Sequence, residues 1–490
     1  MKARLVGIIV LITALISLTP VTATGQLISL KTVPVAAGDQ FLTLPSARLG
    51  MAGVSIALDD MLADPFVNPA KGALIDEPIL VSAPTFYSIS EEGGAGRTLP
   101  ITAYFRSERG FGALSFALQQ IEGGQNRTFV SPGVLWLGDP RTLDESSSTN
   151  VYAHGVIGRE LGGGLSLGAS ISLAKLEAVH GVEHLYALSD GIEQSGHTVD
   201  FRTGLFLDRN GRHFEAVLLH NRFNMTHDVS YLEWFWRDMD FLPTVTTRIE
   251  TNLDRTRTWG LHLGFAQPLT ASGWRIGGIV TANRKSHPKI PNYEIQNIPR
   301  DPGTSWAYNF GVGIAKSSGP ATFGVDLVFE PIWSDTWAEA EGAVTTASGT
   351  TIPDGGKTIE NDFFFTNVHI RIGLAYETER AGFQIGVQSR SYDYRLEQIN
   401  NVEHTFRKQE ESWMEWTPSL GAKVKFPEVE IAYYGRLTTG TGRPGTRFTG
   451  PRAAGDLGLA SDFIVAPEGP LTLQDARVLT HQVSVSIPIR

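Results

Sequence analysis

Two short motifs in this sequence match patterns that carry catalysis in other proteins. Gly164–Gly168 has the Gly-Leu-Ser-Leu-Gly spacing of a nucleophile elbow, and His180–His184 reads His-Gly-Val-Glu-His, an inverted zinc-protease pattern. The elbow requires a strand that turns sharply into a helix, but Ser166 stands inside a run that alternates apolar and small residues. Gly181 weakens the helix that would bring the two histidines to one side. We therefore predict no catalytic residue, no bound metal, no cofactor and no enzymatic activity.

The composition excludes further classes of protein. The 490 residues include no cysteine, which rules out disulfide scaffolds, thiolate zinc sites and cysteine nucleophiles. The formal net charge is −10 and there is no run of Lys or Arg, so nucleic acid is not an expected partner. Charged residues make up 19% of the chain, below the roughly 25% of typical soluble domains.

The first residues predict export from the cytoplasm. Lys2 and Arg4 precede an apolar run, Leu5–Leu18, and small residues follow up to a cleavage site after Ala23. The apolar run is shorter than the roughly 20 residues that a membrane-spanning helix needs. We therefore expect residues 1–23 to be a removable signal peptide rather than an anchor.

Most of the remaining chain alternates with a period of two residues. From Trp306 to Ile314 every second residue is apolar and the residues between are small or polar, and the pattern returns from Phe323 to Phe329 after a short turn. Such alternation places one set of side chains on each face of a strand. The same template predicts hairpins over 98–119, 149–175, 198–224, 257–284, 304–331, 362–394 and 412–437, with a first strand over 78–88 and a last over 477–489.

The lengths of strands and connections indicate a membrane β-barrel. Short turns alternate with long polar connections, as in transmembrane barrels whose short turns lie in the periplasm. The predicted long connections are 120–148, 176–197, 225–256, 285–303, 332–361, 395–411 and 438–476. Predicted strands of about 10–14 residues exceed the five or six residues usual in a soluble β-sandwich, which is the competing interpretation. We expect an all-β fold, a transmembrane antiparallel barrel of 14–16 strands over residues 78–490, with sixteen strands as our count.

The alternation also predicts which face of each strand meets lipid. The apolar faces carry Phe310, Val312 and Phe323, and we assign these side chains to lipid. The opposite faces are rich in small residues with scattered charges, as expected where side chains fill a lumen. On this basis we assign Arg275, Arg371 and Arg390 to the inside of the barrel.

Residues 24–77 do not alternate. They contain Gly50-Met51-Ala52-Gly53, the acidic pair Asp59-Asp60 and the turn Asn68-Pro69-Ala70. Over residues 41–75 this run resembles the N-terminal hatch of the long-chain fatty acid transporter family of outer-membrane barrels and of related secretion-associated barrels. The resemblance implies that residues 24–77 form a hatch that plugs the barrel, with Asn68, Pro69 and Ala70 in the plug.

One predicted external connection is unusually aromatic. Residues 231–242 combine aromatic and acidic side chains, and dense exposed apolar side chains tend to mark a binding or membrane-facing surface. Packing of these side chains back into the barrel mouth is the alternative. The residues that we predict to collect an apolar substrate are Trp234, Phe235, Trp236 and Phe241.

Two functions compete at this stage. The resemblance implies a bacterial outer-membrane channel for passive uptake of hydrophobic small molecules, such as long-chain fatty acids or hydrocarbons. The alternative is a protein-binding barrel that acts in the secretion or surface attachment of exported proteins. The expected partners are outer-membrane lipid, a hydrophobic small-molecule ligand and, in the second case, exported proteins.

Overall fold

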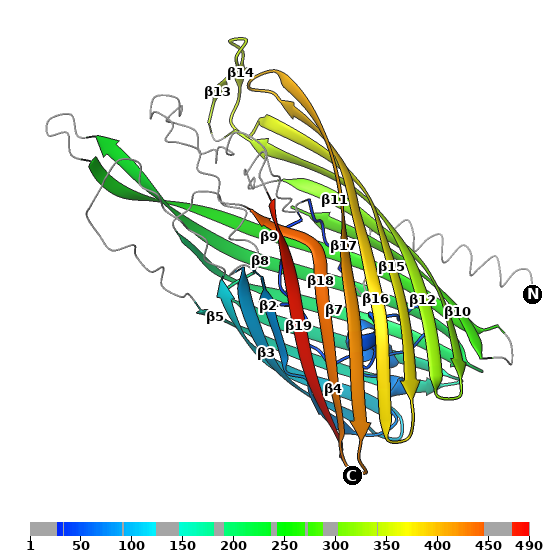
Figure 1. The fold of residues 1–490 in the computed structure, drawn as a ribbon. Coiled ribbons are helices and arrows are strands. Elements are labelled where there is room, and N and C mark those ends of the chain that lie inside the picture. Colours follow the sequence, from blue (N-terminus) through cyan, green and yellow to red (C-terminus); the bar gives the residue numbers. More distant parts are fainter. Residues whose placement is uncertain are drawn as a thin grey trace, which may run out of the picture.

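The computed structural model describes residues 27–489, apart from residues 33, 91–92, 124–146, 181–190, 237–242, 270–272, 288–301, 341 and 445–472. These residues form a tilted barrel (Figure 1). Strands β1 (Ile79–Ser82) and β2 (Thr85–Ile89) both pair with β3 and β19, so they are two halves of one broken strand. The other wall strands are β3 (Gly94–Arg106), β4 (Gly110–Gly123), β5 (Ser147–Gly162), β6 (Leu165–Leu176), β7 (Gly191–Arg209), β8 (Arg212–Trp236), β9 (Pro243–Pro268), β10 (Trp274–Ser286), β11 (Gly303–Ser318), β12 (Ala321–Glu339), β15 (Lys357–Glu377), β16 (Ala381–Asn400), β17 (Thr405–Lys425), β18 (Glu430–Pro444) and β19 (Leu473–Pro488).

The wall is a closed antiparallel ring. Its sheet has 17 strand segments, and counting β1 and β2 as one gives sixteen strands. Each strand pairs with its neighbours in sequence, and β19 completes the ring by pairing with both β18 and the broken first strand. The predicted fold class, the count of sixteen and all seven hairpins are confirmed. A separate two-stranded sheet, β13 (Val344–Thr345) with β14 (Thr351–Ile352), lies in the connection between β12 and β15.

Several predicted long connections are wrong because the strands continue through them. β8 reaches Trp236 and β9 begins at Pro243, so most of the predicted connection 225–256 is strand. The predicted connection 395–411 is likewise strand except for residues 401–404, between β16 and β17. These extensions lie beyond the apolar part of the wall, where the outer face carries polar side chains and the apolar-to-polar alternation that reveals a strand is lost.

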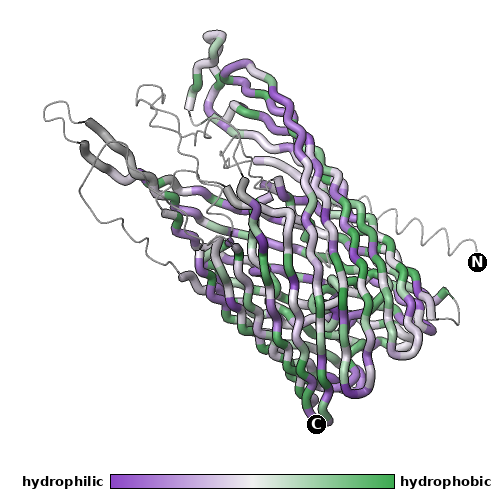
Figure 2. The backbone as a smooth tube through the Cα atoms, viewed as in Figure 1, coloured by the Kyte–Doolittle hydropathy of each residue, from purple (hydrophilic) through white to green (hydrophobic). Residues whose placement is uncertain are grey.

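The predicted facing of the side chains is confirmed. Phe310, Val312 and Phe323 are exposed by 47%, 58% and 38% on the outer surface. Figure 2 shows hydrophobic residues alternating with hydrophilic ones along the strands of the wall. Arg371 and Arg390 make their contacts on the inner side, with Asp326 and His369 of neighbouring strands. No helix among the described residues is long and apolar enough to cross a membrane.

Arg substitution at a lipid-facing position tests the facing. Val312→Arg should lower the free energy of unfolding in lipid vesicles by about 2–4 kcal/mol, because its charge meets hydrocarbon. Val312→Leu is the matched control and should change it little. The neighbouring inward-facing position cannot serve as the control, since a Cβ added at Gly311 would lie 2.5 Å from Cγ1 of Ile279. Equal loss with Leu and Arg would contradict the facing.

Candidate functional site

The segment that precedes the barrel lies against its inner wall on several sides. It contains three short helical turns, η1 (Leu49–Met51), α2 (Asp64–Val67) and η2 (Pro69–Leu74). Near η1, Leu49 packs against Ala432 and Tyr434 of β18. In α2, Phe66 packs against Tyr104 of β3. The backbone N–H of Ser55 also donates to Asp326 of β12, which lies across the ring from β3. The segment therefore crosses the lumen, where Figure 1 shows it as dark blue chain inside the barrel.

The Asn-Pro-Ala turn is fully enclosed. Asn68 and Ala70 are both 0% exposed. The Asn68 side chain accepts a hydrogen bond from the Ala70 N–H at 3.0 Å, which caps η2. The Asn68 amide donates to Oε2 of Glu215 on β8 at 2.9 Å. Gly204 of β7 leaves room for this turn, because a Cβ there would lie 2.0 Å from Oδ1 of Asn68. The predicted hatch residues therefore lie at a tight contact with the wall.

Next to this turn a buried lysine joins the hatch to the wall. Nζ of Lys71 lies 3.0 Å from Asp64, 3.5 Å from Glu215 and 3.6 Å from Asp59. Asp59 also pairs with Nη1 of Arg275, on β10, at 3.0 Å. Glu215 and Arg275 belong to the barrel and the other three residues to the hatch. We call these five residues the Lys71 cluster.

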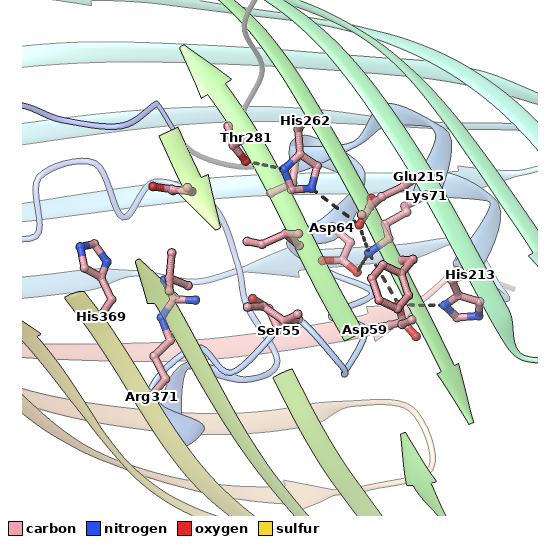
Figure 3. Close-up of a pocket in the computed structure, with 18 residues that line it drawn as sticks. Ser55, Asp59, Asp64, Lys71, His213, Glu215, His262, Thr281, His369 and Arg371 are labelled. Carbon is pink, nitrogen blue, oxygen red and sulfur yellow. Dashed lines mark hydrogen bonds and ion pairs between the residues drawn. The ribbon is translucent and has the colours of Figure 1, made fainter. Parts of the chain in front are cut away.

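Two histidines extend the Lys71 cluster along the wall, and Figure 3 shows how they approach it. Nδ1 of His213 lies 3.4 Å from Asp59. Nε2 of His262 lies 3.9 Å from Glu215, while its Nδ1 is 2.8 Å from the Thr281 hydroxyl. Every charged member of the Lys71 cluster is therefore surrounded by polar partners, as a group removed from water requires.

A cavity of about 90 Å³ lies beside the Lys71 cluster, between the hatch and the wall. Its far side is lined by His369 and Arg371 of β15 (Figure 3). There Asp326 of β12 accepts hydrogen bonds from the backbone N–H groups of Ser55 and Ile56 at 2.8 and 3.3 Å. The hatch is thus attached to the wall through buried charges at two places, β8 and β10 at the Lys71 cluster and β12 at Asp326. The small polar cavity lies beside both attachments.

The hatch carboxyls of the Lys71 cluster have opposite pKa shifts. Burial opposes ionisation of Asp59, but the His213 hydrogen bond and the charges of Lys71 and Arg275 hold its pKa well below the usual range. Burial raises the pKa of Asp64 to about 7, against the attraction of Lys71. Burial alone would lower the pKa of Lys71, but its three carboxylate neighbours raise it above the ordinary value.

A second inward feature is apolar. In the half of β15 that leads away from the short turns, the inner face changes from Arg371, His369 and Asn367 to Phe365 and Phe363. The side chains that pack together there, called the aromatic patch, are Ala307, Ile332, Phe363, Phe365, Tyr394 and Leu396. All six are at most 2% exposed.

The start of the described chain occupies this patch. Ile28 is 2% exposed and packs against the patch, and Lys285 of β10 donates a hydrogen bond to its carbonyl oxygen. Lys31 forms an ion pair with Glu415 of β17, and its Nζ lies 5.4 Å from the centre of the Tyr392 ring.

Polar groups at the border of the patch lack partners. The two polar atoms of the Asn283 amide have no hydrogen bond among the described residues, and neither has the indole N–H of Trp413. Asn283 stands opposite Ala307 of the patch in the sheet, and Trp413 packs against the patch. The patch is therefore an apolar surface with unused hydrogen-bonding groups beside it.

The predicted substrate-collecting residues are only partly covered by the structure. The backbone of Trp234, Phe235 and Trp236 forms the end of β8, opposite Val245, Thr244 and Pro243 of β9. Expecting them in a loop was therefore wrong, and their side chains lie outside the described residues. Phe241 also lies outside the described residues. Their role in collecting substrate stays a prediction.

Sequence reasoning missed the Lys71 cluster and the aromatic patch. The sequence analysis did not single out Lys71, because a partner as distant as Glu215 leaves no local pattern. The sequence did contain a signal for the patch. Phe363 and Phe365 fall on the face of the strand that is predicted to point inward, and they interrupt an otherwise polar run on that face. Ser166 is an inward strand residue, 3% exposed, so the elbow-like motif is part of the wall.

No family model and no curated protein matches this chain. Among solved structures, a FadL homologue of Pseudomonas aeruginosa is 11% identical, covers 93% of this chain and 100% of its own, and has a TM-score of 0.46. The toluene transporter TodX of Pseudomonas putida is 12% identical, covers 96% of this chain and 100% of its own, and has a TM-score of 0.37. The toluene transporter TbuX of Ralstonia pickettii is 11% identical, covers 90% of this chain and 97% of its own, and has a TM-score of 0.37.

Removing the Asn68 side chain should loosen the hatch. Asn68→Ala leaves the Ala70 N–H unpaired and removes one hydrogen bond from Glu215, and a buried group left unpaired costs about 1–3 kcal/mol. We expect faster hydrogen–deuterium exchange in η2 of the detergent-solubilised protein. Asn224→Ala, which removes a contact to His197 within the wall, should leave that exchange unchanged. Unchanged exchange in Asn68→Ala as well would contradict the role of Asn68.

Proposed function

We propose that the protein is a bacterial outer-membrane channel for passive uptake of hydrophobic small molecules. A closed barrel with an apolar outer surface is the form in which β-strands cross a membrane, and barrels of this kind belong to outer membranes. The observation that supports an apolar cargo is the aromatic patch on the inner wall. A water-filled pore needs no apolar inner surface, whereas capture of a hydrocarbon or fatty-acid chain does.

The surroundings of the patch support the same proposal. Ligand sites combine an apolar lining with a few polar groups that orient the ligand. Here the lining is aromatic, the Asn283 amide and the Trp413 indole are free to bond, and Lys285 and Lys31 stand close by. A neutral aromatic compound and an acyl chain with a polar head both fit this combination. The hatch would keep the channel closed to water-soluble solutes.

Alanine substitution in the patch tests the proposal. Burying one aromatic side chain is worth about 1.5–3 kcal/mol. Removing Phe363 and Phe365 together should therefore weaken capture by at least about tenfold, seen as a higher half-saturating concentration for toluene or oleate uptake into proteoliposomes. Phe364→Ala is the matched control, because Phe364 lies between them on the other face and contacts Trp333. Uptake that is equally lowered by the control would contradict the assignment.

A second candidate function is supported by the hairpin of β8 and β9. β7 pairs with β8 only as far as Ser230, and β10 reaches β9 only at Arg257. Beyond these points the two strands pair with each other alone among the described strands, and Figure 1 shows them leaving the wall. Unpaired strand edges are surfaces onto which an extended segment of another protein can add as a strand. A protein-binding barrel would use this hairpin to hold exported proteins.

One variant separates the two functions. We propose Trp234, Phe235, Trp236 and Phe241 as an outer collecting surface for the apolar substrate. Replacing the first three with Ser should slow uptake at low substrate concentration, while the barrel still shows the heat-dependent gel mobility of a folded protein. Normal uptake combined with loss of an exported protein from the cell surface would contradict the collecting role and favour the second function.

A further inference from the structure

The Lys71 cluster is placed where it can control the hatch. It contains residues of the hatch and residues of two wall strands, so it can form only when the hatch is docked. Lys71 is 8% exposed, and three carboxylates lie within 3.6 Å of its Nζ. We propose that this cluster is an electrostatic lock on the hatch, and that the protonation state of Asp64 sets whether the lock holds.

The balance of charges gives the direction of the effect. With Asp64 protonated, the ammonium of Lys71 and the guanidinium of Arg275 face two carboxylates, those of Asp59 and Glu215. With Asp64 ionised, the same two cations face three carboxylates in a space with little water. Because an unbalanced buried charge is strongly destabilising, ionisation of Asp64 weakens docking.

Asp64 is surrounded by charged and hydrogen-bonding groups of both the hatch and the wall strands. Oδ2 of Asp64 accepts hydrogen bonds from Lys71 and from the backbone N–H of Asp60. Arg202 of β7 donates to the carbonyl oxygens of Phe66 and Val67 at the end of α2. The carboxylate of Asp60, also buried beside Asp64, accepts hydrogen bonds from the Ser46 hydroxyl and from the backbone N–H groups of Leu62 and Ala63. The other charged or titratable groups near the lock are Arg48, Asp59, Tyr104, His154, Asp200, Asp208, His213, Glu215, His262 and Arg275, with His369 and Arg371 across the cavity.

The expected response to pH follows from linkage. Burial raises the pKa of docked Asp64 to about 7, above that of a free carboxyl. A group of this kind stabilises the docked state below its free pKa and loses that stabilisation as the pH rises through its docked pKa. The ratio of open to closed channels should therefore rise with pH, by at most about tenfold per pH unit for a single proton, and level off above about pH 7.

Ion conductance in planar bilayers between about pH 5 and pH 8 tests the lock without any hydrophobic substrate. The wild type should open more often as the pH rises. Asp64→Asn, which is neutral at every pH, should stay mostly closed with no such rise. Lys71→Met should be open throughout, and Lys71→Arg should restore closure. A wild type with no pH dependence, or an Asp64→Asn variant that keeps the rise, would overturn the proposal.

A second lysine in the barrel serves as the matched control. Lys423 is also 8% exposed and lies 3.0 Å from Glu377 and 3.6 Å from Glu430, but all three residues belong to the wall. Lys423→Met should keep the conductance of the wild type at each pH, and an open Lys423→Met channel would contradict the special role of Lys71.

The proposal of the lock rests in part on the proposed function as a channel. Conductance that follows pH in a protein without hydrocarbon uptake would leave the lock standing and remove the uptake function.

Discussion

Closure of the hydrogen-bonded ring is the constraint on which the rest of this structure depends. Hydrocarbon offers no partner to a backbone N–H or C=O, so a sheet that spans it can have no open edge. β19 meets this condition by pairing with β18 on one side and with β1 and β2 on the other. Once the ring is closed, each strand has one face for lipid and one for the lumen, and the sequence alternates accordingly.

The inner face then has to accommodate the hatch. Its glycines allow the backbone of the hatch to approach closely, as at Gly204, and its charged side chains pair with hatch residues. Burying charges is unfavourable unless each is paired and hydrogen-bonded, and Lys71 with its three carboxylates and Oδ2 of Asp326 with the Ser55 N–H meet that requirement. Such attachments add specificity of position rather than large net stability, which suits a segment that the proposed lock holds in one place and releases.

The fold was largely predictable because lipid imposes a regular pattern. Phe310 and Val312 of β11 stand two residues apart, as do the lipid-facing Leu327 and Phe329 of β12, which is the spacing that a membrane-facing strand requires, and the turns between strands are short. The strand extensions were not predictable, since above the apolar belt both faces of β8 and β9 lack the lipid that enforces the pattern. The position of the N-terminal segment inside the barrel was expected only from a family resemblance, and its action as a plug stays a prediction. The Lys71 cluster could not be predicted, because Lys71 and Glu215 are joined only by the three-dimensional fold.

The seam at which the ring closes also determines the order of events during folding. Gln482 of β19 donates a hydrogen bond to Thr85 of β2, 397 residues earlier. Contacts of such separation form slowly, because a long chain has to be ordered before they form. Until then β2 and β19 are unpaired edges, and a barrel precursor with two open edges is prone to join other chains. The time before the ring closes is therefore the period in which this protein most needs a chaperone.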